Sequence, residues 1–206
     1  HHGTYADLDH RGFGDIWTLT VEEYLAAPRR KRLAYRLYRS PFVFLGIGPG
    51  YMFLIAQRRQ HAWKKKDKSN SIFFTNEAIC VITVSASLTI GWQTYLLIQL
   101  PIMLVAGAIG VWLFYVQHQF EDTVWQHDDQ WRFHEAALRG ASHYELPAPM
   151  AWFTGNIGVH HVHHLSSRIP FYRLSEVLRD HPQLASLGRL TFLESLRCAT
   201  LALWDE

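Results

Sequence analysis

The chain has 206 residues, of which 49% are hydrophobic and 13 are histidines, and its formal net charge is only +2. This length suits one domain of ordinary size, and the near-balanced charge leads us to expect no nucleic-acid partner. Cys80 and Cys198 are too few for a disulfide framework, so we expect two reduced thiols in a reducing compartment.

The chain begins with His1 and His2 instead of a methionine, and these residues do not open a signal peptide. We therefore expect an N-terminally truncated sequence that was cut inside a histidine motif. A remnant of a purification tag is the alternative, although the two histidines are followed at once by Gly-Thr-Tyr.

The apolar stretch at about 41–57 contains three glycines and an internal proline, which do not favour a straight helix. Clusters of Lys and Arg lie on both sides of it, and an excess of these residues marks cytosolic flanks. We therefore predict an interfacial or re-entrant element that enters and leaves on one side of the membrane. The clusters contain Arg29, Arg30, Lys31, Arg32, Arg36 and Arg39 before the stretch, and Arg58, Arg59, Lys64, Lys65, Lys66 and Lys68 after it.

The 43 residues from 78 to 120 contain no Asp, Glu, Lys or Arg. One membrane crossing needs about 20 apolar residues, so this run predicts two transmembrane helices, at about 77–92 and 96–117, joined by a short uncharged turn. Gly107 and Gly110 are expected to permit close helix packing. A buried helical hairpin in a soluble protein is the alternative, which the length of the run and its lack of charge disfavour.

These placements predict an all-α integral membrane protein with a single domain over 1–206. Its parts are a transmembrane helical hairpin, an interfacial helix and a cytosolic helical cap. Positive charge and the lack of further crossings place residues 1–40, 58–76 and 118–206 on the cytosolic side. Histidines near both ends of the chain can therefore meet on the same side of the membrane.

The sharpest motif is the segment 156–164, which has four histidines in its last five positions. In a helix, His160, His163 and His164 share one face because each residue turns the helix by about 100°. Three imidazoles on one face can bind a metal ion such as zinc, copper, iron or nickel. His161 lies about 100° away from His160 and is the predicted non-ligand. A group of hydrogen-bonded surface histidines is the alternative.

His118 ends the second predicted crossing, where an ionisable residue is a functional candidate. A capping or interfacial histidine is the alternative. Glu121 and Asn156 are the expected hydrogen-bonding partners that orient the imidazoles. The remaining histidines are interpreted as ordinary surface residues, and they are His10, His61, His127, His134, His143 and His181.

Four stretches carry a resemblance to a known family. They are DHRGFGDIW at 9–17, LAYRLYR at 33–39, GVWLFYVQH at 110–118 and TGNIGVHHVHHLS at 154–166. With these stretches the chain resembles the membrane fatty acid desaturases, and most closely the bacterial acyl-lipid desaturases. The resemblance covers nearly the whole chain and is far more specific than the HxxHH pattern alone.

The resemblance implies two non-haem iron ions, held by three histidine boxes at the cytosolic ends of membrane helices. The third box matches His160, His163 and His164, and the last two histidines of the second box match His1 and His2. The additional histidine at a helix end matches His118. The first box and the leading histidine of the second box are absent from this sequence, so the fragment alone is expected to hold an incomplete, inactive site.

The reaction that the resemblance implies takes O2, two electrons and a lipid-linked fatty acyl chain, and it gives a double bond and water. Removing hydrogen from an unactivated CH2 group requires a strong oxidant, which iron supplies while the protein sets ligands and access. The histidines at 118, 160, 163 and 164 are then catalytic through the metal.

The implied partners are membrane lipids and an external electron donor of the ferredoxin, flavodoxin or cytochrome type. The expected location is the bacterial inner membrane, with the active site on the cytosolic face. The two basic clusters suit an acidic donor or anionic lipid headgroups, and plain topology determinants are the alternative.

A hydroxylase acting on an acyl chain or a carotenoid is an alternative on the same scaffold, because hydroxylation and desaturation share the first hydrogen abstraction. A histidine-rich metal transporter is less favoured. Transporters place polar ligands near the bilayer midplane, whereas residues 78–116 contain no Asp, Glu or His. A zinc-binding regulatory membrane protein is a further alternative.

Overall fold

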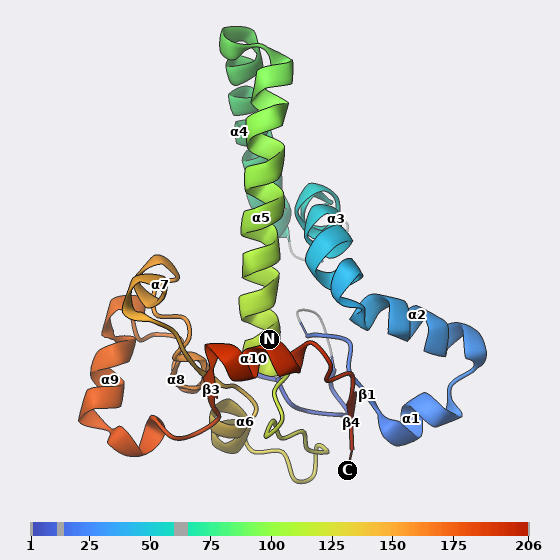
Figure 1. The fold of residues 1–206 in the computed structure, drawn as a ribbon, viewed down its shortest axis with the longest axis vertical. Coiled ribbons are helices and arrows are strands. Elements are labelled where there is room, and N and C mark those ends of the chain that lie inside the picture. Colours follow the sequence, from blue (N-terminus) through green and yellow to red (C-terminus); the bar gives the residue numbers. More distant parts are fainter. Residues whose placement is uncertain (1, 12–14, 60–65, 206) are drawn as a thin grey trace. The chain divides into compact units, whose positions relative to one another are not determined.

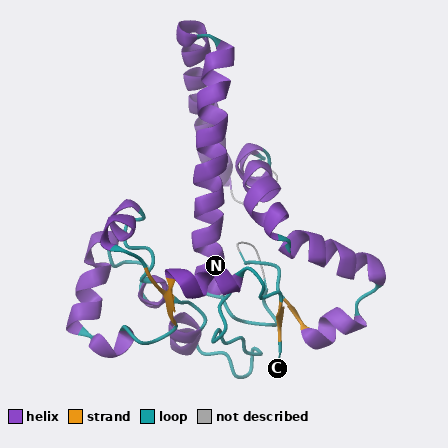
Figure 2. Cartoon of the chain, viewed as in Figure 1, coloured by secondary structure: helices purple, strands orange, loops and turns teal. Residues whose placement is uncertain are grey.

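The computed structural model is mostly helical (Figures 1 and 2). It describes residues 2–11, 15–59 and 66–205. The chain divides into two compact units, of which unit 1 contains His1–Arg32 with Leu113–Glu206, and unit 2 contains Leu33–Trp112. The longest helix, α5 (Trp92–His118), begins in the residues of unit 2 and ends in those of unit 1.

The apolar stretch that follows the first basic cluster is a broken helix. After α2 (Arg29–Arg39) come a π-helical segment (Phe42–Ile47), α3 (Gly48–Leu54) and a short 3-10 turn (Ala56–Arg58). The helical axis bends by 60° between α2 and the segment Phe42–Arg58. By length and composition this pair is either one broken membrane span or a re-entrant loop.

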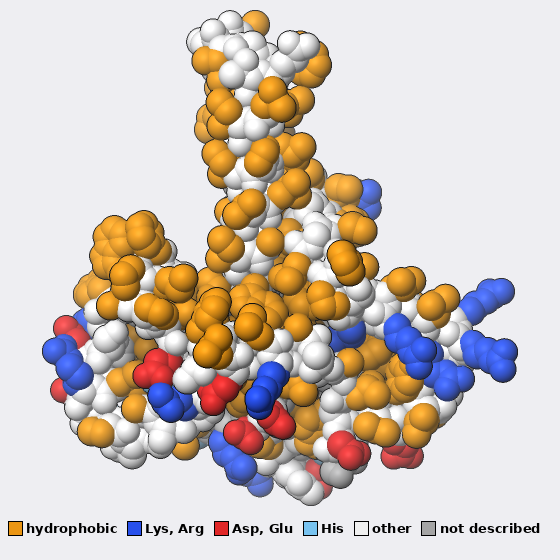
Figure 3. Space-filling model, in the orientation of Figure 1, with side chains coloured by type: hydrophobic (Ala, Val, Ile, Leu, Met, Phe, Trp, Pro, Cys, Tyr) orange, Lys and Arg blue, Asp and Glu red, His pale blue; other side chains and the backbone are white. Residues whose placement is uncertain are grey.

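Within the described residues, two helices are long and apolar enough to cross a membrane. The candidate spans are Asn70–Ile90, within α4 (Lys66–Ile90), and the whole of α5. At about 1.5 Å per residue they are about 31 and 40 Å long, enough for a hydrocarbon core of about 30 Å. Gly91, with φ of +85°, is the single residue between them, and hydrophobic side chains cover their surfaces (Figure 3).

The two glycines expected to permit close packing on α5 differ in their surroundings. A Cβ added at Gly107 would lie 3.0 Å from Cβ of Pro49 and 3.2 Å from the Phe53 ring, so α3 approaches α5 at this glycine. A Cβ added at Gly110 would meet nothing within 4 Å. The prediction of close packing is therefore confirmed at Gly107 and not at Gly110.

Unit 1 contains short helices around the C-terminal end of α5. They are α1 (Val21–Ala26), α6 (Phe133–Arg139), α7 (Ala148–Phe153), α8 (His160–Leu165), α9 (Leu174–Asp180) and α10 (Phe192–Cys198), with 3-10 turns at Phe171–Arg173 and Pro182–Leu184. Thr20 and Glu23 form a capping box at the start of α1, as Thr191 and Glu194 do for α10.

Unit 1 also contains two pairs of parallel strands, which corrects the expectation of an all-α chain. β1 (Leu19–Thr20) pairs with β4 (Leu203–Trp204), and β2 (His143–Glu145) pairs with β3 (Arg189–Thr191). Strands of two or three residues are too short to show the alternating pattern by which a strand is predicted from sequence.

The buried side chains of unit 1 form small cores near the histidine motif. One core contains Val159, Val162 and Leu174, and it packs α8 against α9. Another contains Tyr5, Ala6, Leu8, Trp125 and Ala136. Both cysteines are free thiols, as expected, with Cys198 buried and Cys80 exposed.

Candidate metal centre

Three buried histidines from two segments meet in unit 1. His118 is the last residue of α5, and His160 and His164 lie on α8. Their exposed fractions are only 0%, 5% and 2%. The Nε2 atoms of His118 and His160 are 3.1 Å apart, and one ligand atom from each of the three lies within 4.8 Å of the others. This spacing suits a shared metal ion.

His2 and His163 extend this group. The His2 ring centroid lies 4.7 Å from that of His163 and 4.6 Å from that of His164. Residues 2, 118 and 160–164 are therefore brought together, as the sequence analysis expected of the two ends of the chain. His1 lies outside the described residues. We call His2, His118, His160, His163 and His164 the histidine cluster.

Close backbone contacts fix the loop that precedes α8. Gly155 and Asn156 both have positive φ, of +63° and +53°, and they turn the chain after α7. A Cβ on Gly158 would lie 2.3 Å from the Tyr144 carbonyl oxygen, so only glycine fits there. The Tyr144 amide donates to the Gly158 carbonyl at 2.7 Å. α8 thus begins at a position set by β2.

His161 points away from the cluster. Its Nε2 lies 3.0 Å from the Leu184 carbonyl oxygen, which makes Nε2 the hydrogen-bond donor. Its ring lies 5.6 Å from that of His143, and it is 0% exposed. Burial, followed by the nearby His143, lowers the pKa of His161 to about 4. This neutral, hydrogen-bonded imidazole supports the packing of α8 rather than the cluster.

Donors from three segments satisfy the last carbonyl groups of α5, which have no partner within the helix. Ser142 donates its hydroxyl to the Val116 carbonyl at 3.2 Å and its amide to the Gln117 carbonyl at 3.0 Å. The Tyr5 hydroxyl donates to the His118 carbonyl at 2.8 Å, and Gln119 Nε2 donates to the same oxygen at 3.0 Å. These bonds hold His118 in position.

Tyr5 also contacts the cluster through its ring, and the sequence analysis did not identify it. The ring centroid lies 4.3 Å from that of His118 and 5.4 Å from that of His164. The Tyr5 side chain is only 2% exposed. Because Tyr5 and His118 are 113 positions apart, no spacing rule links them, and the three-residue separation from His2 was the only available signal.

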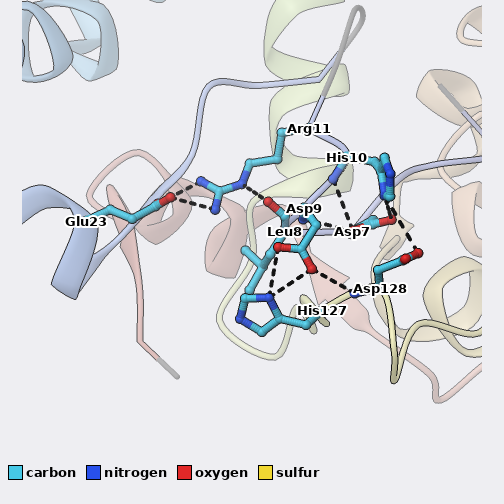
Figure 4. A network of polar contacts seen from close by, with 8 residues as sticks. All are labelled: Asp7, Leu8, Asp9, His10, Arg11, Glu23, His127 and Asp128. Atoms are coloured by element: carbon cyan, nitrogen blue, oxygen red, sulfur yellow. Dashed lines mark hydrogen bonds and ion pairs between the residues drawn. The ribbon is translucent and has the colours of Figure 1, made fainter.

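Backbone and ionic contacts hold the segment that carries His2 and Tyr5. The Trp131 indole donates to the Tyr5 carbonyl at 2.9 Å, and the amides of Leu8 and Gln126 donate to the carbonyls of Gln126 and Ala6 at 2.9 Å each. Arg11 forms a bidentate pair with Glu23, at 2.8 and 2.9 Å (Figure 4).

Carboxylates and histidines next to this segment form a second group, which we call the Asp–His network. His10 Nδ1 lies 2.8 Å from Asp7 Oδ2 and 3.7 Å from Asp128 Oδ1 (Figure 4). His127 Nδ1 lies 3.1 Å from both carboxylate oxygens of Asp9. Asp7, His10 and Asp128 also have the spacing of a metal-binding set, but their close ion pairs account for that spacing.

Burial sets the protonation of the histidine cluster. It lowers the pKa values of His160 and His163, and it lowers that of His164 to about 3, with a further contribution from the His2 charge. Burial and then the neighbouring His163 lower the pKa of His2. The imidazoles of His160 and His164 are therefore neutral at physiological pH, which is the form that binds metal ions.

The donor set fits a metal centre by its spacing and its chemistry. The Nε2 atoms of the buried His118 and His160 lie 3.1 Å apart, a separation that suits two imidazole nitrogens bound to one metal ion at about 2.0–2.1 Å each. Neutral imidazoles that converge without carboxylates suit a transition metal such as iron, whereas calcium and magnesium prefer oxygen ligands.

The two expected orienting residues do not join the cluster through the described hydrogen bonds. The Asn156 amide donates to the Phe171 carbonyl at 3.3 Å, and its carbonyl oxygen accepts from Ser175 at 3.3 Å. Glu121 is exposed. Its charge adds to burial in raising the pKa of Cys198, which is about 11. The part of Glu121 and Asn156 in orienting an imidazole stays a prediction.

The remaining described histidines belong to unit 1. His10, His127, His134 and His181 are exposed, in agreement with their interpretation as surface residues. His143 is partly buried, and its Nδ1 lies 2.7 Å from the Ala185 carbonyl oxygen. His61 lies outside the described residues.

Comparison with known proteins agrees with this geometry. Residues 1–194 match the sequence model of the family described as fatty acid desaturase. The chain is also 48% identical over 206 residues to a curated protein named fatty acid desaturase from Bacillus subtilis (strain 168), and this match covers 100% of the chain and 58% of that relative. The chain thus spans less than two thirds of the relative's length. It belongs to the fatty acid desaturase family.

Proposed function

We propose that the full-length gene product is an oxygen-dependent desaturase that introduces a double bond into a lipid-linked fatty acyl chain. The observation that carries this proposal is the convergence of His118, His160 and His164, which are buried, with the adjoining His2 and His163. Fatty acid desaturases generally use two iron ions and O2. We assign His1, His2, His118, His160, His163 and His164 as iron ligands contributed by this chain.

When bound, iron supplies the oxidising power that removes hydrogen from an unactivated methylene group. The chain's residues supply the conditions for that chemistry. The imidazoles of His160 and His164 stay neutral, and the burial of His118, His160 and His164 excludes bulk water from the centre. Tyr5 and Ser142 fix the end of α5, and with it the direction of the His118 ring.

The proposed overall reaction balances as follows. A saturated –CH2–CH2– unit, one O2, two electrons and two protons give –CH=CH– and two water molecules. The electrons come from an external donor of the ferredoxin, flavodoxin or cytochrome type. The basic residues on α2 are exposed in part, and we propose them, with the second basic cluster, as the surface that attracts an acidic donor or anionic lipids.

The proposed topology follows from the two candidate spans. α4 and α5 cross the bacterial inner membrane, while residues 1–40, 58–76 and 118–206 lie on the cytosolic face. The segment 41–57 enters and leaves on that face as an interfacial or re-entrant element. Its 60° bend with α2 and its low helical regularity support this placement.

Lipid analysis of a host that expresses the full-length gene tests the reaction. A desaturase product is lighter than its precursor by two hydrogens, whereas a hydroxylase product on the same scaffold is heavier by one oxygen, as the stoichiometry of iron and O2 chemistry requires. We expect unsaturated acyl chains that disappear when His160 is replaced by Ala. An oxygenated acyl chain or carotenoid, with no new double bond, would contradict the proposal.

A further inference from the structure

Unit 1 exposes a group of large apolar side chains beside the histidine motif. Trp152 and Phe153 at the end of α7 are 74% and 80% exposed, and Phe171 and Tyr172 are 60% and 64% exposed. Met150 adds a further exposed apolar side chain. We call these five residues the aromatic patch. Side chains of this kind are unusual on a surface that faces water.

Close contacts join the two halves of the aromatic patch into one surface. A Cβ added at Gly155, two residues after Phe153, would lie 3.3 Å from the Phe171 ring. The Asn156 side chain donates to the Phe171 carbonyl at 3.3 Å. The loop after α7 therefore lies against the 3-10 turn Phe171–Arg173, so the two halves of the aromatic patch are neighbours in the fold.

A second exposed apolar edge lies on α10. Its inner side is anchored by Ser195, whose hydroxyl lies 3.1 Å from that of Tyr144, and by the buried Cys198. Its outer side carries Phe192, Leu193 and Leu196, which are 44%, 74% and 54% exposed. α10 is thus amphipathic, with its apolar edge turned out of the unit.

The continuity of α5 indicates what covers these surfaces. α5 is a candidate membrane span, and its last residues, from Leu113 to His118, belong to unit 1. The side of unit 1 at which α5 enters must therefore lie at the membrane. α7 and α10 lie on this side of the unit (Figure 1), and hydrophobic side chains gather over α7 (Figure 3).

We infer that the aromatic patch, together with the outer edge of α10, inserts into the interfacial layer of the phospholipid bilayer. Trp and Tyr concentrate at this layer because their rings are apolar at one end and polar at the other. Short apolar faces that lie in the plane of the membrane enter it to a depth of about 5–10 Å. This membrane contact holds one face of unit 1, the unit that contains the histidine cluster, against the lipid. The inference does not depend on the proposed reaction.

Site-directed spin labelling tests this contact in the full-length protein. The protein is reconstituted in vesicles of phosphatidylcholine and phosphatidylglycerol, with all its native cysteines, Cys80 and Cys198 included, replaced by Ala. Single cysteines are introduced as Phe153→Cys, Tyr172→Cys and Leu193→Cys, and each is labelled with a nitroxide. Collisions with O2, which concentrates in lipid, are compared with collisions with a water-soluble nickel chelate.

Gln130→Cys and Gln183→Cys are the matched controls, because both glutamines are exposed residues of the same unit outside the patch. We expect the ratio of O2 to nickel collisions to be several-fold higher at 153, 172 and 193 than at the controls. Equal ratios would overturn the inference. Low collision rates with both reagents at 153 and 172 would also overturn it, because they would indicate that a protein surface covers the patch.

Discussion

The histidine cluster and the Asp–His network both gather histidines from distant parts of the chain, but their environments are opposite. In the cluster, His118, His160 and His164 are almost completely buried and face other imidazoles. In the network, the His10 and His127 side chains are 58% and 49% exposed and face carboxylates.

The difference shows that the neighbouring groups and the exposure to solvent, rather than the residue type, decide whether a histidine ring is neutral or charged. Burial lowers the pKa values of His160 and His164, so these rings are neutral and have lone pairs for a metal ion. In the network, the hydrogen bond that His10 donates to Asp7 raises the pKa of His10, which favours the charged form of that ring. We expect the cluster to bind metal and the network to position the segment that carries His2 and Tyr5.

The largest expected effect is a difference in bound iron between a variant of the histidine cluster and a variant of the Asp–His network. His164→Ala in the full-length protein removes a buried, proposed ligand and should lower iron affinity and unsaturated product by about 100-fold or more, because the loss of a residue that only supports a ligand already costs about 10–100-fold. His127→Ala should leave iron content unchanged, because His127 contacts Asp9 at the surface. Metal analysis and lipid profiling measure both variants. Equal iron loss in the two variants would contradict the proposed difference between the histidine cluster and the Asp–His network.

A backbone substitution tests how the cluster is positioned. Gly158→Ala places a Cβ against the Tyr144 carbonyl oxygen, which cannot move without disturbing β2. We expect the free energy of unfolding to fall by about 1–3 kcal/mol, as for other overpacked sites. Gly110→Ala is the control, because its Cβ meets nothing within 4 Å. Denaturation in detergent compares the two, and an unaffected Gly158→Ala would refute the close contact.

Much of the site was predictable from the sequence, because the HxxHH spacing and the position of His118 follow from local rules. The resemblance to the family added His2, 158 positions before His160 in the chain. Tyr5 and Ser142 were not predictable, since they act through main-chain carbonyls of α5 that no side-chain pattern records. The two strand pairs were missed because two or three residues show no periodicity.

A smaller effect is expected at Tyr5, which lies on the segment beside the Asp–His network and contacts the histidine cluster. Tyr5→Phe keeps the ring against His118 but removes the hydroxyl that donates to its carbonyl. Because Gln119 donates to the same oxygen, we expect a stability loss of only about 1 kcal/mol. Iron affinity should fall by about 10-fold, the lower range for residues that support a metal ligand. Tyr172→Phe, at an exposed ring, is the control. If iron affinity were the same in both variants, Tyr5 would have no positioning role.

The smallest effect concerns the pH dependence of the network. The pKa of His10 is raised above 6.5, so its ion pair contributes stability below this value and loses it as pH rises through the raised pKa. The pKa of Asp9 is lowered below 3.8 by hydrogen bonds from Asp128 and His127, so its contribution persists above 3.8 and is lost at more acid pH. His10→Gln should therefore lower Tm slightly near pH 6 and hardly at all near pH 9. A Tm difference that grows with pH would contradict the ion pair.

Metal analysis of the purified full-length protein, combined with X-ray absorption at the metal edge, tests the central claim most directly. The account predicts about two iron ions per chain with imidazole nitrogen among their ligands, and a loss of bound iron or of part of its imidazole signal in His160→Ala but not in His10→Ala. A protein that forms unsaturated acyl chains while its iron has no imidazole ligands, or that holds only zinc, would contradict the account.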